Sequence, residues 1–349
     1  MTDTAVLFEN LHPVADAPLL AAGLRIERHA SALEPADLHT ALGDARVAGI
    51  RSRTKMTAAA FDAAPRLLAL GCFCIGTNQV DLDAAASHGI PVFNGPFGNT
   101  RSVAELTLAS VIMLMRGVPL RASAAKRGEW LKSATNSHEV RGKKLGIVGY
   151  GNIGSQLSVL ASGLGMHVYF YDVEPKLAHG NARSVGSLDE LLELCDVVTL
   201  HVPSLPTTHN MMNAQAIARM KPGSILINQA RGDLVDIDAL CAALESGHLI
   251  GAAVDVFPKE PASKDEAFVT PLQKFENIIL TPHVGGSTLE AQEAIGDDVA
   301  AKLARFLSHG ATKGAVNVPE IEPGAIKTGR VRLLSFHGNA PGYLSRLND

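Results

Sequence analysis

The sequence lacks three features that would each point to a different class of protein. It has four cysteines in 349 residues and no C-x-x-C pair, so we expect free thiols and no metal site. It has no run of lysine or arginine and a net charge of −4, which disfavours nucleic acid or an anionic membrane as a partner. It has no apolar run of membrane-spanning length and no leader-like N-terminus. We therefore expect a soluble, cytoplasmic protein.

What the sequence does have is apolar residues, 46% of the total, in a chain long enough for two domains. Short apolar runs alternate with helical patterns, which indicates parallel βαβ units. The predicted fold class is therefore α/β, with two doubly wound parallel sheets of the Rossmann-like or flavodoxin-like kind. The predicted strands of the first sheet are 5–8, 24–27, 47–50, 67–70 and 91–93, with helices near positions 17, 36, 59 and 82.

The rest of the chain predicts a second sheet of six strands. Capping boxes at Ser102 and Glu105, and at Ser187 and Glu190, predict a long helix over about 102–126 and another over 188–194. A third, beginning at Ser287, predicts a helix to about position 307. The predicted strands of the second sheet are 144–149, 168–171, 197–202, 224–228, 250–254 and 277–280. In the tail, 331–337 reads as a strand and 343–348 as the beginning of a helix.

A glycine-rich turn follows the first strand of the second sheet and spells Gly149-Tyr-Gly151-Asn-Ile-Gly154. Gly149 permits the tight turn, Gly151 lets backbone approach a pyrophosphate, and Gly154 lets the following helix pack close to the sheet. The N–H groups at the beginning of that helix favour phosphate. Asp172, at the end of the next strand, can accept hydrogen bonds from a ribose and would repel a 2′-phosphate. The pattern predicts NAD rather than NADP as cofactor.

Three polar residues each follow a later predicted strand: Arg231, Glu260 and His283. Singly, each is most often a surface or structural residue. Together they supply the groups needed to oxidise a 2-hydroxy acid: an arginine fork for the carboxylate, a histidine for the hydroxyl proton, and a carboxylate that stabilises the protonated imidazole. Asp255 is a second candidate for the histidine's partner. It could instead lie near the nicotinamide or be an ordinary acid at a strand end.

The first half contributes a basic loop and a polar residue whose roles sequence leaves open. Arg51, Arg53 and Lys55 follow a predicted strand and could bind a substrate phosphate, or they could form a solvated turn. Asn99 could contact substrate or cap the following helix.

These stretches carry a resemblance. The glycine motif with Asp172, the segment NQAR ending at Arg231, DVFPKEP from Asp255, and TPHVGGST around His283 resemble the D-isomer-specific 2-hydroxyacid dehydrogenase family over nearly the whole chain. The resemblance implies that Arg231, Glu260 and His283 are catalytic. It implies substrate contacts at Arg51, Arg53, Asn99, Arg231 and His283. It implies cofactor contacts at Gly149, Gly151, Asn152, Ile153, Gly154, Asp172, Gln229, Ala230, Arg231, Asp255, His283, Val284, Gly285 and Gly286.

The resemblance also implies a domain plan. Residues 1–99 and 286–320 would form a substrate domain and 100–285 the NAD domain, with the active site in the cleft between them. Residues 321–349 would be a linker and the beginning of an incomplete domain similar to the small ACT regulatory domain. A homodimer or homotetramer through the NAD domain is implied as well, which would bury part of the helix after Ser102 and Trp130.

Within the family, the resemblance is to enzymes that oxidise 3-phospho-D-glycerate to 3-phosphohydroxypyruvate, the first step of L-serine biosynthesis. A side activity that reduces 2-oxoglutarate to 2-hydroxyglutarate is compatible with the same groups. Two alternatives remain: a dehydrogenase for another small D-2-hydroxy acid such as lactate or glycerate, and an NAD-sensing protein similar to transcriptional corepressors.

Overall fold

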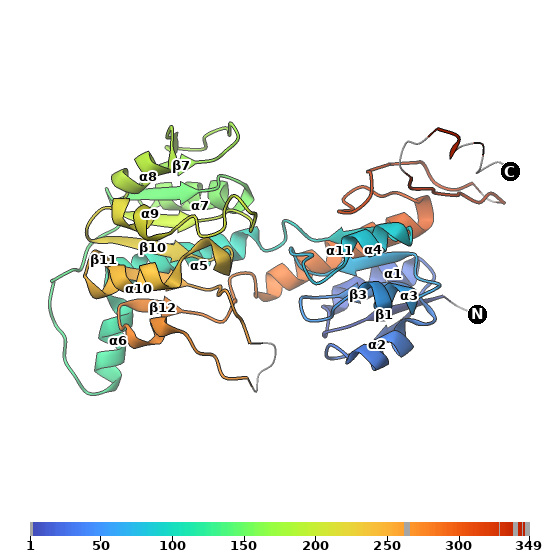
Figure 1. Ribbon diagram of the computed structural model, residues 1–349, viewed down its shortest axis with the longest axis horizontal. Coiled ribbons are helices and arrows are strands. Elements are labelled where there is room, and N and C mark those ends of the chain that lie inside the picture. The colour runs from blue at the N-terminus through green and yellow to red at the C-terminus, as the bar shows by residue number, and fades with distance from the viewer. Residues whose placement is uncertain (1–2, 262–265, 328, 338–340, 344, 346–349) are drawn as a thin grey trace. The chain divides into compact units, whose positions relative to one another are not determined.

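The computed structural model describes every residue except 1–2, 262–265, 328, 338–340, 344 and 346–349 (Figure 1). The chain divides into two compact units. Unit 1 consists of Met1–Gly98 and Leu289–Asp349, and unit 2 consists of Asn99–Thr288. An active site between the two units stays a prediction.

Unit 1 is built on a five-stranded sheet in the order β2-β1-β3-β4-β5, with every pair of neighbours parallel. This order is that of the flavodoxin-like doubly wound fold, as the alternation of strands and helices predicts. The strands are β1 Thr4–Leu7, β2 Arg25–Arg28, β3 Ala45–Ile50, β4 Ala69–Cys72 and β5 Val92–Asn94. The helices are η1 Pro13–Ala15, α1 Asp16–Ala21, α2 Pro35–Leu42, α3 Ala58–Asp62, α4 Leu82–Ser87 and α11 Leu289–His309.

Helices cover both faces of this sheet because its buried strands point apolar side chains alternately to either side. In β1, Ala5 and Leu7 face a core shared with α1 and α11, whereas Val6 faces a core shared with α2, α3 and α4. The helix α11, which comes from the far end of the chain, supplies Val299 and Leu303 to the first of these cores. The two separated segments therefore fold as one unit.

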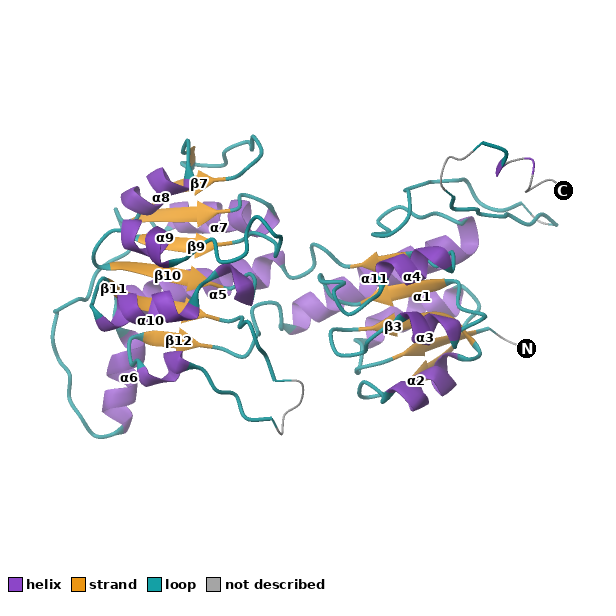
Figure 2. Cartoon of the chain, viewed as in Figure 1, coloured by secondary structure: helices purple, strands orange, loops and turns teal. Residues whose placement is uncertain are grey.

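Unit 2 is built on a seven-stranded parallel sheet in the order β12-β11-β10-β9-β6-β7-β8 (Figure 2). The strands are β6 Lys144–Val148, β7 His167–Tyr171, β8 Arg183–Ser184, β9 Val197–Leu200, β10 Ser224–Asn228, β11 Leu249–Val254 and β12 Ile278–Leu280. The helices are α5 Thr100–Met115, α6 Val118–Lys126, α7 Asn152–Gly163, α8 Leu188–Leu194, α9 Ala214–Arg219, α10 Ile237–Glu245, η2 Gly232–Leu234 and η3 Pro271–Lys274. The prediction of six strands was one short, because β8 is a two-residue edge strand with no apolar pattern.

The helices of unit 2 again lie on both faces of the sheet, α5 and α7 on one and α8, α9 and α10 on the other (Figure 2). Strand β10 shows the alternation, since Ile225 and Ile227 face α5 and α7 while Leu226 faces the opposite core. The chain order crosses from one side of β6 to the other, with β7 on one flank and β9 on the other. In open parallel sheets this switch point, at the carboxyl ends of the strands, is where ligands bind.

The predicted single helix over 102–126 is wrong. The chain forms two helices, α5 and α6, that meet at a bend of 70°. Gly117 takes a left-handed conformation with φ of 57°, and Pro119 lies in the first turn of α6. The predicted cap is also wrong: α5 begins at Thr100, and the Ser102 hydroxyl lies 2.8 Å from the Thr288 hydroxyl.

The predicted strand 331–337 is wrong as well, because the described residues of that segment are irregular. The segment packs on unit 1 instead: Leu334 contacts the core that contains α11, and the Arg332 guanidinium donates to the carbonyl groups of His309 and Gly324. The predicted helix 343–348 lies for the most part outside the described residues.

Within the described part of the chain, no single helix has the length and apolar character needed to cross a membrane, and only α5 and α6 taken together across their bend reach that length and composition.

Candidate active site

The glycine turn after β6 has the geometry that its sequence predicts. Gly149 has φ of 92°, and a Cβ there would lie 2.6 Å from the carbonyl oxygen of His201. A Cβ on Gly154 would lie 2.3 Å from the Gly149 carbonyl oxygen, whereas a Cβ on Gly151 would meet no atom within 4 Å. Gly149 and Gly154 are therefore required by the fold itself. The fold does not require a glycine at position 151, so close approach of a ligand is the remaining reason for a glycine there.

The helix α7 begins directly after this turn, with Gly151 as its N-cap and no side chain capping it. Its first N–H groups are therefore left for solvent or a ligand, and the helix dipole favours an anion there. Asn152 is exposed and Ile153 half-buried at this end. The donors that a pyrophosphate needs are thus present, and the turn fits a dinucleotide.

Asp172, at the end of β7, holds this turn in place. Its carboxylate accepts hydrogen bonds from the Tyr150 N–H at 2.8 Å and from the Glu174 N–H at 3.0 Å. A carboxylate offers about four acceptor positions, so capacity remains for a ribose hydroxyl. The residue predicted to select NAD also ties the strand end to the glycine turn.

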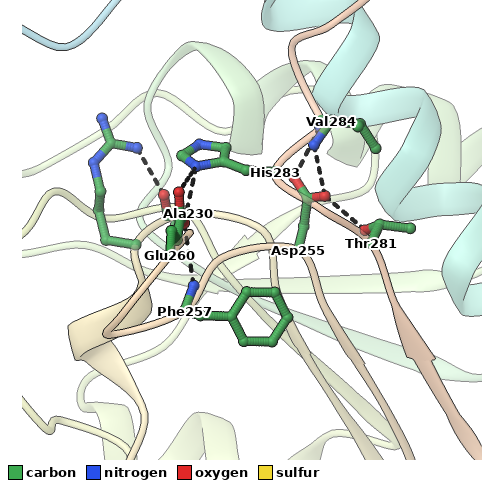
Figure 3. Close-up of polar contacts among 9 residues, drawn as sticks. Ala230, Asp255, Phe257, Glu260, Thr281, His283 and Val284 are labelled. Carbon is green, nitrogen blue, oxygen red and sulfur yellow. Dashed lines mark hydrogen bonds and ion pairs between the residues drawn. The ribbon is translucent and has the colours of Figure 1, made fainter. Parts of the chain in front are cut away.

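Asp255, after β11, is buried and anchors the loop that carries His283 (Figure 3). Its carboxylate accepts from the Thr281 hydroxyl at 2.6 Å and from the N–H groups of Val284 and Gly285, both at 2.8 Å. The backbone oxygen of Asp255 also accepts from the His283 N–H at 2.8 Å. These four bonds hold His283 in a left-handed conformation with φ of 54°.

His283 and Glu260 form a close pair (Figure 3). The imidazole Nδ1 lies 3.0 Å from both carboxylate oxygens of Glu260, which also accepts from the Phe257 N–H at 3.3 Å. The pairing leaves Nε2 of the ring as the nitrogen that can exchange a proton with another molecule. The His283 side chain is 50% exposed, so it can be reached by a substrate.

The pair shifts the pKa of each member toward the charged form. The hydrogen bond that His283 donates to Glu260 raises the pKa of His283 above its ordinary value, and burial opposes this rise. The charges of Glu260 and Asp255 add to the rise, and that of Arg231 counteracts it. Burial favours a higher pKa for Glu260, but the hydrogen bond and charge of His283 outweigh it and lower that pKa. The arrangement stabilises an imidazolium beside a carboxylate.

Arg231 lies close enough to both members of this pair for its charge to act on their pKa values. It follows β10 and precedes the short helix η2, and its guanidinium donates to the carbonyl oxygen of Ala230 at 2.7 Å. The Asn228 side chain donates to the Arg231 carbonyl at 2.9 Å and fixes the turn. The structure therefore brings together the three side chains that sequence singled out from three strand ends.

Other predicted contacts are engaged inside the protein. The Gln229 side chain accepts from the Thr107 hydroxyl at 2.7 Å and donates to the Ser110 hydroxyl at 3.2 Å, both on α5, so only its backbone is left for a ligand. Asn99 occupies the N-cap position of α5 without making a cap bond, and its buried Oδ1 has no hydrogen-bond partner among the described residues. A Cβ on Gly286 would lie 2.2 Å from Asn99 Nδ2, so a larger residue there would displace the Asn99 side chain.

The basic loop lies in unit 1, after β3, and depends on a residue that sequence reasoning missed. The Glu9 carboxylate accepts hydrogen bonds from the N–H groups of Arg51 at 3.1 Å, Arg53 at 3.1 Å and Thr54 at 2.8 Å. The Arg53 side chain is exposed and that of Arg51 half-buried. The sequence shows Glu9 as an acid directly after a predicted strand. It does not show what the acid binds, because its partners lie more than 40 residues away.

Comparison with known proteins assigns the chain to a family. Residues 108–285 match the NAD-binding domain of the D-isomer specific 2-hydroxyacid dehydrogenases. The D-3-phosphoglycerate dehydrogenase of Haemophilus influenzae is 58% identical over 99% of this chain and 84% of its own length. That of Escherichia coli is 56% identical over 98% of this chain and 83% of its own length. The chain belongs to the D-isomer specific 2-hydroxyacid dehydrogenase family.

A similar solved structure supports the assignment of fold and cofactor. The D-lactate dehydrogenase from Aquifex aeolicus, solved with NAD and lactic acid, superposes with a TM-score of 0.73 and is 28% identical. The superposition covers 87% of this chain and 95% of that one. In the present chain, residues 108–285, which match the NAD-binding domain, lie in unit 2. NAD is therefore the cofactor of this protein.

Proposed function

We propose that the protein catalyses the NAD-dependent oxidation of 3-phospho-D-glycerate to 3-phosphohydroxypyruvate, the reaction that opens L-serine biosynthesis. The relatives named D-3-phosphoglycerate dehydrogenase support the substrate. The observation that carries the chemistry is the bond between His283 Nδ1 and Glu260, with Arg231 beside it. Bound NAD supplies the hydride acceptor for this reaction.

His283 moves the proton. Its Nε2 takes the proton from the substrate hydroxyl as the carbon is oxidised, and it returns that proton when the 2-oxo acid is reduced. Glu260 holds the ring through Nδ1 and stabilises the imidazolium, so a single residue can act as base and as acid. The anchoring of its loop by Asp255 gives His283 a fixed position.

Arg231 binds the substrate carboxylate. A planar, permanently charged guanidinium can hold a carboxylate through two parallel hydrogen bonds, which fixes the angle at which the neighbouring carbon is presented. The same positive charge opposes the rise in the pKa of His283 that the hydrogen bond to Glu260 causes. Arg231 thus combines substrate positioning with control of the base.

NAD is held by the glycine turn and by the ends of the neighbouring strands. Gly151 and the first N–H groups of α7 would contact its pyrophosphate, and Asp172 would accept from the adenosine ribose. The strand ends contribute backbone at Ala230 and Val284. Because the carboxylate of Asp172 would repel a 2′-phosphate, this site favours NAD over NADP.

The substrate phosphate is bound by Arg51 and Arg53 in unit 1. Within the part of the chain that the structure describes, neither guanidinium makes a hydrogen bond or an ion pair, although their backbone groups do. Two free guanidinium groups separated by one residue suit a dianion. A non-phosphorylated substrate would gain nothing from them.

A reductive assay tests the proposed substrate. Purified protein with NADH is offered 3-phosphohydroxypyruvate, hydroxypyruvate, pyruvate and 2-oxoglutarate, and NADH loss is followed. We expect the highest kcat/KM with 3-phosphohydroxypyruvate and a fall of about 10- to 100-fold for that substrate in Arg51→Ala. Equal rates with phosphorylated and non-phosphorylated substrates, unaffected by Arg51→Ala, would contradict the proposal and favour a dehydrogenase for another small 2-hydroxy acid.

We also propose that the protein is a homo-oligomer through unit 2. Trp130, after α6, is 85% exposed and its neighbour Leu131 is 46% exposed, so two adjacent large apolar side chains face away from the core of unit 2. Light scattering coupled to size-exclusion chromatography measures the mass. A smaller particle for Trp130→Ala than for wild type would support this interface, and a monomeric wild-type protein would exclude it.

A further inference from the structure

Glu9, at the end of β1, occupies a backbone conformation that glutamate rarely adopts. Its φ is 63°, and that of Asn10 is 50°, so two consecutive residues lie in the left-handed region. Outside glycine, such conformations persist when the surrounding structure enforces them, and they gather at functional sites. The left-handed conformation of Glu9 is held by the hydrogen bonds that its carboxylate accepts from three N–H groups.

These three bonds join two neighbouring strand ends of the unit 1 sheet. Oε1 accepts from Arg51 and Thr54, and Oε2 accepts from Arg53. Hydrogen bonds to an ionised acceptor are about twice as strong as neutral ones. The loop that carries the two arginines is therefore held from the β1 side through its backbone.

A buried side chain holds the same loop from the β4 side. The Gln79 amide donates to the Arg51 carbonyl oxygen at 2.8 Å and, at 3.3 Å, to that of Gly76. Gln79 is 4% exposed and Thr54 is 1% exposed. The backbone of Arg51 is thus held at its N–H by Glu9 and at its carbonyl oxygen by Gln79. The guanidinium groups of Arg51 and Arg53 extend from this loop without partners among the described residues.

This arrangement also decides which groups can bind an anion. The N–H groups of positions 51, 53 and 54 are satisfied by Glu9, so they are not available as a backbone nest for phosphate. At these three positions, only the side chains are left for an anion. We propose that Glu9 is a positioning residue that sets the preference for a phosphorylated substrate by holding the Arg51 and Arg53 loop, an inference that rests on the proposed function.

The test uses a matched pair of glycine variants in the full-length protein. Glu9→Gly removes the carboxylate and suits the left-handed backbone, so the strand end itself is not penalised. Asn10→Gly makes the same kind of change one position later, at an exposed residue with no side-chain bond to the loop among the described residues. A difference between the two variants therefore measures the effect of removing the Glu9 carboxylate.

The first measurement compares 3-phosphohydroxypyruvate with hydroxypyruvate, which differ by the phosphate alone, with NADH as reductant. We expect the ratio of their kcat/KM values to fall about 10- to 100-fold in Glu9→Gly, chiefly through KM of the phosphorylated substrate. Asn10→Gly should keep the wild-type ratio. Glu9→Gln should lie between them, because it keeps one acceptor oxygen and turns an N–H donor toward the loop.

The second measurement follows amide hydrogen exchange at positions 51, 53 and 54, and it does not depend on turnover. These amides should exchange faster in Glu9→Gly and Glu9→Gln than in wild type and Asn10→Gly. If Glu9→Gly does not fold, Glu9→Gln carries both measurements, since it keeps the size of the side chain.

The outcomes separate this inference from the proposed function. Unchanged exchange, or faster exchange with an unchanged substrate ratio, would overturn the role of Glu9 while the wild-type enzyme still prefers the phosphorylated substrate. A wild-type protein with no such preference would overturn the proposed substrate and this inference with it. Faster exchange together with a reduced ratio in the Glu9 variants alone supports the inference.

Discussion

The two units share a doubly wound parallel topology, but the loops that follow their first strands are chemically opposite. After β6, a glycine turn leaves backbone N–H groups at the beginning of α7 open to a ligand. After β1, Glu9 supplies a carboxylate that occupies the N–H groups of a neighbouring loop. The loop after the first strand of such a sheet can therefore offer backbone N–H groups to a ligand, or it can carry a side chain that occupies the N–H groups of another loop.

The difference extends to the chemistry that each unit can perform. Unit 2 holds the His283–Glu260 pair, Arg231 beside it and the glycine turn after β6. Unit 1 holds the two unpartnered arginine side chains of the described loop after β3 and the side chains that fix it. On this comparison, changes in unit 2 should affect catalysis or NAD binding with every substrate, and changes in unit 1 should affect the choice of substrate.

The largest expected effect is that of His283→Ala in unit 2. Removing the proposed acid/base should lower kcat about 10²- to 10⁴-fold for phosphorylated and non-phosphorylated substrates alike. Steady-state assays in both directions measure it, with His167→Ala, an exposed histidine at the first residue of β7, as control. A loss confined to one substrate class would contradict the division of roles between the units.

The next effect is on NAD binding and comes from a pair of glycine variants. Gly151→Ala adds a methyl group that meets no protein atom within 4 Å, so it should weaken NAD about tenfold or more with little change in Tm. Gly154→Ala places a Cβ against the Gly149 carbonyl and should destabilise the fold by about 1–3 kcal/mol. Calorimetric titration and thermal unfolding separate the two; full NAD affinity in Gly151→Ala would mean that the cofactor does not approach there.

A smaller effect is expected for cofactor choice. Asp172→Ser removes a negative charge and should reduce the preference for NAD over NADP by about tenfold, mainly by improving NADP. The ratio of kcat/KM for the two cofactors measures it. Because Asp172 also accepts from the Tyr150 and Glu174 N–H groups, Tm should be recorded alongside. An unchanged cofactor ratio with a lower Tm would leave Asp172 with a purely structural role.

The smallest effect is a displacement of the pH profile. The hydrogen bond to the Glu260 carboxylate raises the pKa of His283, so Glu260→Gln should lower that pKa. Oxidation needs the neutral imidazole and gains rate as pH rises through this pKa; reduction needs the imidazolium and loses rate over the same range. Both limbs of kcat/KM against pH should therefore move to lower pH in Glu260→Gln. A profile that stays in place would identify a different group as the base.

Sequence reasoning reached most of the site because its signals are local. A G-x-G-x-x-G turn after a strand predicts its own backbone conformation, and Gly149 has the positive φ that such a turn requires. It failed where a local signal was ambiguous. The pattern over 102–126 is helical throughout, yet Gly117 and Pro119 end one helix and begin another. A two-residue strand such as β8 carries too little pattern to be recognised.

By itself, the sequence determined the α/β class, the glycine turn, and the set of polar residues at strand ends, since each depends on periodicity or on a residue's own backbone preference. Only the tertiary structure decided which contacts each of three acidic residues makes. Glu260 pairs with His283, Asp255 anchors the loop beneath it, and Glu9 holds a loop more than 40 residues away. The reason is physical: parallel strands bring their carboxyl ends to one edge, and that edge joins residues that chain order keeps apart.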